Sequence, residues 1–147
     1  MWSDVLQHAE RMHLLRLCLW GALSTLAGTT VLVLGRQRSA FLRSFGWVCG
    51  LFGVLELLIA GAAYRGTPLR DIAGATRLDR MAWLQLGLFL GLAAVGVTLA
   101  ASPRVMRMRA DPSSDTMLPA VGAGMAITLH GLALTILQLL LIADISR

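Results

Sequence analysis

The sequence contains no lysine and no asparagine, so all thirteen of its basic residues are arginines. Together with the abundance of alanine, glycine, leucine and valine, these absences indicate a protein from a GC-rich bacterial genome. The arginines are scattered beside apolar segments and form no continuous basic patch. We therefore expect the net charge of +5 to attract anionic lipid headgroups, and we predict no nucleic-acid partner.

Cysteine is almost as scarce, since the chain contains only Cys18 and Cys49. Their separation matches no metal-binding cysteine motif. Each lies near the start of one of two consecutive apolar runs, which would enter a membrane from opposite sides. At ~1.5 Å per residue the two thiols would lie roughly 20 Å apart in depth, too far for an intramolecular disulfide. We interpret both as small apolar packing residues.

Catalytic motifs are missing as well. The chain has no nucleophile elbow, phosphate-binding loop, dinucleotide fingerprint or paired carboxylates. One glutamate and one histidine within the apolar runs supply too few ligands for a metal. The first thirteen residues lack the apolar core and the small-residue cleavage site of a signal peptide. We predict a non-enzymatic protein with no catalytic residues, no metal and no cofactor.

What the sequence does contain is long apolar runs. A hydrophobic fraction of 56% and a mean hydropathy of +0.71 are too high for an ordinary soluble domain of 147 residues. Four of the runs are long enough to cross a bilayer. We predict an all-α integral membrane four-helix bundle that forms a single transmembrane domain. Its spans are expected at residues 17–34, 45–64, 82–101 and 119–143.

The segments that flank these runs carry their own signals. Residues 1–13 alternate apolar and polar positions at helical spacing, which predicts a short amphipathic helix on the membrane or leading into the first span. Thr67 before Pro68 predicts the start of a short surface helix. Thr76 with Asp79 resembles a capping box at the start of the third span. Residues 102–119, with three prolines, predict a loop.

Aromatic residues near the span ends support these boundaries. We interpret Trp20, Trp47, Trp83 and Tyr64 as an interfacial aromatic belt. Four spans place both termini on one side with seven arginines, against six on the other. We predict a bacterial inner-membrane protein with cytoplasmic termini. A balance this even also permits insertion in both orientations, and so an antiparallel homodimer.

Two ionisable residues stand out within the apolar runs. Glu56 and His130 are each the twelfth residue of a span, and the second and fourth spans run in the same direction. Their depths should therefore agree to within about one turn, or ~5 Å. A hydrogen bond between them would satisfy two groups that are costly to bury in lipid. Ser24, Thr25 and Thr128 are expected in the same polar layer.

Small residues recur on three of the spans at three- and four-residue spacing. Such stripes let membrane helices approach closely, and they predict contacts within the bundle and with a second copy or a larger membrane complex. The expected packing residues are Gly21, Gly28, Gly46, Gly50, Gly53, Gly87 and Gly91. Gln85, Gln138 and Tyr64 lie toward the membrane side of the termini. They either line the mouth of a cavity leading to Glu56 or hydrogen-bond across helices.

Three functions fit this pattern. The first is a non-enzymatic helix bundle or accessory subunit stabilised by the Glu56–His130 layer. The second is proton-coupled transport by a dimer, because a mid-depth glutamate in a small four-helix protein resembles small multidrug transporters, in which a shared carboxylate alternates between a proton and a cation. The third is pigment or haem binding through His130, because Ala126 precedes it by one turn, as in the A-x-x-x-H motif of light-harvesting helices.

Three apolar segments also resemble a family of small, uncharacterised four-span bacterial membrane proteins. They are WGALSTLAG, FGWVCGLFGVLELLIAG and GAGMAITLHGLALTILQLLLIAD. The last span of that family carries a G-x-G…Q-G…L…D pattern, which Gly122, Gly124, Gly131 and Asp144 match. His130 stands where the family more usually has glutamine, and Glu56 lies near positions that often hold asparagine. The resemblance implies a four-helix membrane bundle in which a polar pair hydrogen-bonds between helices.

Overall fold

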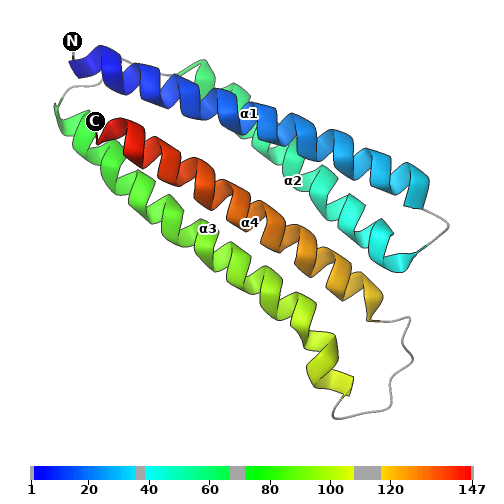
Figure 1. The fold of residues 1–147 in the computed structure, drawn as a ribbon. Coiled ribbons are helices and arrows are strands. Elements are labelled where there is room, and N and C mark those ends of the chain that lie inside the picture. The colour runs from blue at the N-terminus through cyan, green and yellow to red at the C-terminus, as the bar shows by residue number, and fades with distance from the viewer. Residues whose placement is uncertain (1, 36–38, 67–71, 108–116, 147) are drawn as a thin grey trace.

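The computed structural model describes residues 2–35, 39–66, 72–107 and 117–146. These residues form four helices, α1 (Trp2–Gly35), α2 (Ala40–Tyr64), α3 (Ile72–Arg107) and α4 (Leu118–Ile145). All four are long and apolar enough to cross a membrane, which confirms the predicted all-α architecture at that level. The N- and C-termini lie at the same end of the molecule (Figure 1).

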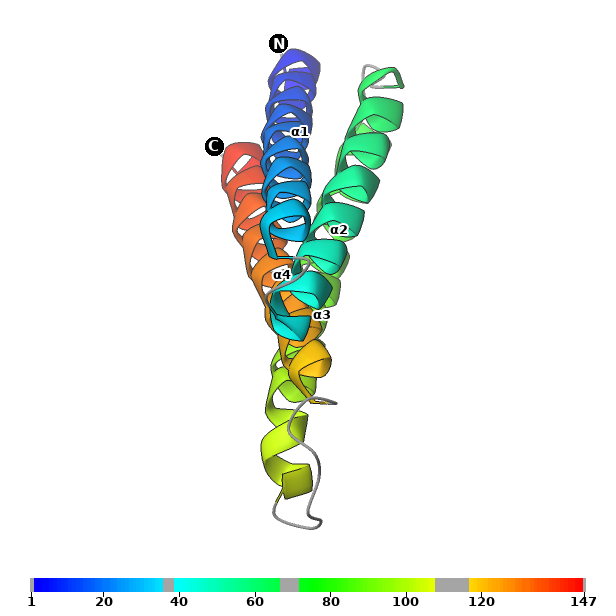
Figure 2. The ribbon, with the colours of Figure 1, turned by 90° about the vertical axis from the view of Figure 1, so that its right-hand side faces the viewer.

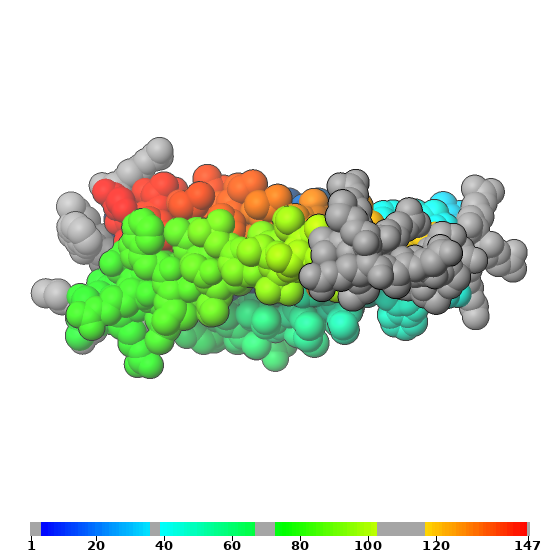
Figure 3. Space-filling view, turned by 90° about the horizontal axis from the view of Figure 1, so that it is seen from below, coloured from blue at the N-terminus to red at the C-terminus, as the bar shows by residue number. Residues whose placement is uncertain are grey.

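The helices form two hairpins, α1 with α2 and α3 with α4, and α4 joins them by packing against both α1 and α2. α3 lies along α4 and makes few close contacts with α1 or α2. Figure 3 shows α3 in front, with α4 along one edge and α2 along the other. Figure 2 shows that α1 and α2 diverge toward the end that holds the N-terminus. The bundle is therefore more open at that end.

Glycines set the closest approach within each hairpin. A Cβ at Gly28 would lie 2.4 Å from the amide nitrogen of Gly50, and one at Gly53 would lie 2.5 Å from that of Thr25. In the second hairpin a Cβ at Gly96 would lie 2.4 Å from the amide nitrogen of Thr128. Backbone atoms cannot give way, so these contacts require glycine. Other glycines with such contacts include Gly21, Gly46, Gly124 and Gly131.

The packing face predicted for the third span is wrong. Apart from their own helix, no atom of the described residues comes within 4 Å of a Cβ at Gly87 or Gly91, and both residues are exposed. The buried face of α3 is instead formed by Ala82, Leu86, Ala93 and Gly96. This face lies about 100° or more around the helix from the predicted stripe, so Gly87 and Gly91 point away from α4. Gly50 belongs to a close contact only through its backbone. A Cβ at Gly28 would clash with that backbone, whereas a Cβ at Gly50 would have no atom of another described helix within 4 Å.

The helix ends agree with the prediction only in part. The predicted N-terminal helix leads directly into the first span, because α1 is continuous from Trp2, and its Ala9 packs against Ala82 and Leu141. Thr76 and Asp79 lie inside α3, which begins at Ile72, so they do not cap it. α3 also continues through the start of the predicted loop to Arg107. The predicted cap at Thr67 and Pro68 lies outside the described residues.

The outer surface of the described helices is strongly apolar. Exposed side chains include Leu19, Leu26, Val33, Leu58 and Val95. A surface of this kind is stable against lipid acyl chains and costly in water. Trp47 and Trp83 are exposed, as expected of interfacial aromatic residues.

Candidate functional site

Glu56 and His130 meet at the centre of the bundle. Nδ1 of His130 lies 2.9 Å from Oε1 of Glu56, and the two residues are 0% and 4% exposed. Glu56 is buried because it lies on the glycine-rich face of α2, one turn after Gly53. His130 lies on the buried face of α4, one turn after Ala126. The hydrogen bond therefore joins the first hairpin to the second.

Aromatic rings enclose the imidazole of His130. Phe52 stacks on it with centroids 4.9 Å apart, and Trp20 meets it edge-on at 5.8 Å. Trp20 is thus an interior neighbour of His130, and its assignment to the interfacial belt is wrong. Nε2 of His130 has no accessible surface. A haem or chlorin ring would have to displace packed side chains to reach that nitrogen, which argues against the pigment hypothesis.

The three hydroxyl residues of the predicted polar layer lie at helix crossings. The hydroxyl groups of Thr25 and Thr128 donate to the carbonyl oxygens of Gly21 and Gly124, each four residues earlier in its own helix. Both threonines face a glycine of the neighbouring helix. Ser24 is buried on α1. The structure therefore brings Glu56 and His130 together, whereas both threonines hydrogen-bond within their own helices.

Gln138 is a second buried polar group on α4, two turns after His130. It is 0% exposed, and its Nε2 donates to the carbonyl oxygen of Ala82 on α3 at 3.1 Å. Its Oε1 is buried and has no hydrogen-bond partner among the described residues, and the same is true of Oε2 of Glu56. Two buried acceptor oxygens thus remain available near the centre of the bundle.

Both side chains line a cavity of about 690 Å³. All four helices contribute to its walls, and it extends from the end that holds the termini inward to Glu56. Its polar and charged lining residues are Glu10, His13, Glu56, Arg77, Gln85 and Gln138. Tyr64 was predicted at the cavity mouth, but it is 48% exposed and does not line the cavity. The lining residues of α1 and α2 lie toward the end at which these two helices diverge (Figure 2).

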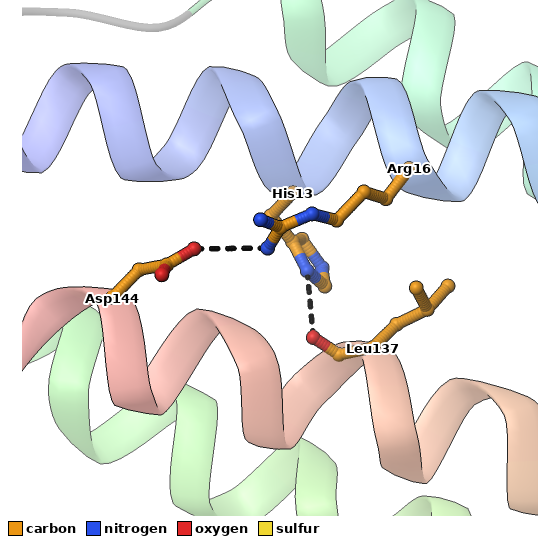
Figure 4. A network of polar contacts seen from close by, with 4 residues as sticks. All are labelled: His13, Arg16, Leu137 and Asp144. Atoms are coloured by element: carbon orange, nitrogen blue, oxygen red, sulfur yellow. Dashed lines mark hydrogen bonds and ion pairs between the residues drawn. The ribbon is translucent and has the colours of Figure 1, made fainter.

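A polar network links α1 to α4 beside the cavity (Figure 4). Arg16 donates to Asp144 at 2.9 Å, and Nδ1 of His13 lies 3.2 Å from the carbonyl oxygen of Leu137. The Arg16 and Asp144 side chains are 32% and 29% exposed, so their ion pair contributes at most about 1 kcal/mol. From the sequence, Arg16 is one of the arginines beside an apolar run. Its partner could not be identified without knowing that α1 and α4 lie side by side.

The chain belongs to DUF6992, a family of unknown function whose profile matches residues 16–139. The match includes Glu56, His130 and Gln138, and it confirms the expectation of a family without a known activity. No curated protein and no solved structure matches the chain.

Proposed function

We propose that this member of DUF6992 is a non-enzymatic membrane bundle or accessory subunit whose two hairpins are held together by the Glu56–His130 pair. The observation that carries the proposal is the 2.9 Å contact between Nδ1 and Oε1, buried where α2 crosses α4. We place the protein in a bacterial inner membrane with cytoplasmic termini. We also propose that it assembles as a homo-oligomer or within a larger membrane complex.

The pair suits a structural role because each partner satisfies one polar atom of the other, Oε1 of Glu56 and Nδ1 of His130. An ionisable side chain in the hydrocarbon region is costly unless it is paired or faces a cavity. Among the described residues, the α2–α4 contact is the largest that joins the hairpins, followed by the contact between α1 and α4. A polar link at this position therefore stabilises the relative placement of the two hairpins.

Glu56→Gln tests this role. Glutamine retains an acceptor oxygen for the Nδ1–H of His130, so the helices should stay together and the melting temperature in detergent should stay within a few degrees of wild type. Glu56→Leu should lower the melting temperature instead, because leucine has no hydrogen-bonding atoms. An equal melting temperature for Glu56→Gln and Glu56→Leu would contradict the structural role.

Proton-coupled transport is a second candidate, and the cavity that ends at Glu56 favours it. A carboxylate reached from one end of the bundle is positioned to exchange its proton. In vesicles containing the full chain, a pH gradient should drive accumulation of ethidium, a fluorescent organic cation. Glu56→Gln should remove this uptake while the protein stays folded. Uptake that is equal in the variant, or in protein-free vesicles, would exclude transport through Glu56.

A further inference from the structure

We propose that the cavity between the hairpins is a binding site for a small apolar molecule that carries a protonated primary amine. The amine would lie at the inner end and donate to Oε2 of Glu56, and Oε1 of Gln138 would be a further acceptor on the cavity wall. A volume of about 690 Å³ is within the range of small-molecule sites. The inference rests on the cavity and its acceptors, and it does not require that the protein transport the ligand.

The acceptors determine which headgroup fits. Gln138 already donates its Nε2 to Ala82, which fixes the amide and leaves Oε1 without a partner among the described residues. Glu56 uses Oε1 for His130 and leaves Oε2 without one. Both oxygens are buried, on side chains that are 0% and 4% exposed and that line the cavity. A group with several N–H donors and a positive charge satisfies both, whereas an anion satisfies neither.

The walls determine the rest of the molecule. Most of the remaining lining is aliphatic or aromatic, contributed by Leu14, Leu17, Leu88, Phe89, Leu134 and others. Ile59, Met81 and Leu88 line the cavity and are also exposed on the outer surface. The cavity is therefore continuous with an apolar surface that lipid covers. The part of the ligand beyond the amine should therefore be apolar, and the ligand should enter the cavity from the bilayer.

Among the described residues, few titratable groups surround the site. Glu56 holds His130 of α4 through Oε1, and Cys49 lies two turns earlier on α2. Nearer the termini, Glu10 and His13 of α1 and Arg77 of α3 line the cavity. At the inner end Glu56 is the acidic lining residue, so it is the group that attracts an ammonium ion.

The test compares two probes of the same shape. Adamantylamine carries a primary ammonium group on an apolar cage, and adamantanol carries a neutral hydroxyl group on the same cage. Calorimetric titration of the full chain in detergent should show saturable binding of the amine, at least about tenfold tighter than the alcohol, because a charge-assisted hydrogen bond is lost with the alcohol.

Three variants make the result specific. Glu56→Gln should weaken amine binding by at least about tenfold, with little effect on the alcohol. Leu134→Phe places a larger side chain in the cavity, one turn from both His130 and Gln138, and should weaken both probes. Leu129→Phe is the matched control, because Leu129 lies exposed on the outer face of α4. This variant should bind both probes as wild type does.

Several outcomes would overturn the inference. They are equal affinity for amine and alcohol, unchanged amine binding in Glu56→Gln, or non-saturating uptake that reflects partition into detergent. Melting temperatures recorded on the same samples keep this result separate from the structural role of Glu56. If binding is absent while Glu56→Leu still lowers the melting temperature, the ligand site fails and the structural proposal stands. If the amine binds as predicted while Glu56→Leu leaves the melting temperature unchanged, the structural proposal fails and the ligand site stands.

Discussion

Replacing Gly96 by alanine is expected to force α3 away from α4 and to destabilise the protein. The new Cβ would lie 2.4 Å from the amide nitrogen of Thr128, 2.5 Å from its Oγ1 and 2.7 Å from the carbonyl oxygen of Gly124. Two of these atoms belong to the backbone of α4, so the clash is relieved only if the helices separate. We expect a loss of about 1–3 kcal/mol in the free energy of unfolding, as for other overpacked cores.

Gly91→Ala is the matched control for this prediction. It adds the same methyl group to the same helix, at an exposed position where no described residue outside the local helix comes within 4 Å of the Cβ. Its stability in detergent should equal that of wild type or exceed it slightly, because alanine favours helix more than glycine does. Reversible unfolding in a denaturing detergent measures both variants. Equal stabilities for the two would show that the α3–α4 crossing is less close than described.

The contrast between Gly96 and Gly91 shows that the sequence did not reveal which face of α3 meets α4. In water, a helix reveals its buried face as an apolar stripe, but the exterior of these helices is apolar as well. Small residues on α3 fall on more than one face, and spacing alone could not select the one that meets α4. The close approach of Gly96 to Thr128 depends on the rotation of both helices about their axes. That rotation is set by packing against neighbours.

The polar pair was more predictable, because it depends on depth and not on rotation alone. Counting residues along two spans of the same direction placed Glu56 and His130 at one level, and they are 2.9 Å apart in the structure. The count contained no information about lateral neighbours. Phe52 and Trp20 around the imidazole were therefore missed. The hydrogen bond from Gln138 to Ala82 on α3 was missed as well, because the sequence does not show which helices are adjacent.

Helix length was misjudged for a related reason. Thr76 and Asp79 predicted the start of the third span's helix, and the prolines of residues 102–119 predicted a loop. Yet α3 extends from Ile72 to Arg107. A helix that packs against a neighbour need not stop where the bilayer does, since tertiary contacts override local signals. The cluster of Ala9, Ala82 and Leu141 supplies such contacts near the termini.

Removing both members of the central pair is expected to cost less stability than the two single removals together. Glu56→Leu leaves Nδ1 of His130 buried without its partner, and His130→Leu does the same to Oε1 of Glu56. An unsatisfied buried polar group costs about 1–3 kcal/mol. We expect each single variant to lose that much in the free energy of unfolding. The double variant has no orphaned partner, and its loss should be smaller than the sum of the two.

The size of the coupling distinguishes a structural pair from a chance contact. Hydrogen bonds between membrane helices typically yield coupling energies of about 0.6 kcal/mol, with a maximum near 1.7 kcal/mol. We expect a value toward the upper end here, because the pair is 0% and 4% exposed and Phe52 and Trp20 hold the imidazole in place. A double-variant cycle by reversible unfolding measures it. Substituting Leu for Ser24, which is buried but is not part of this pair, should combine additively with His130→Leu. If the Glu56 and His130 variants were also additive, the link between the hairpins would have to come from apolar packing alone.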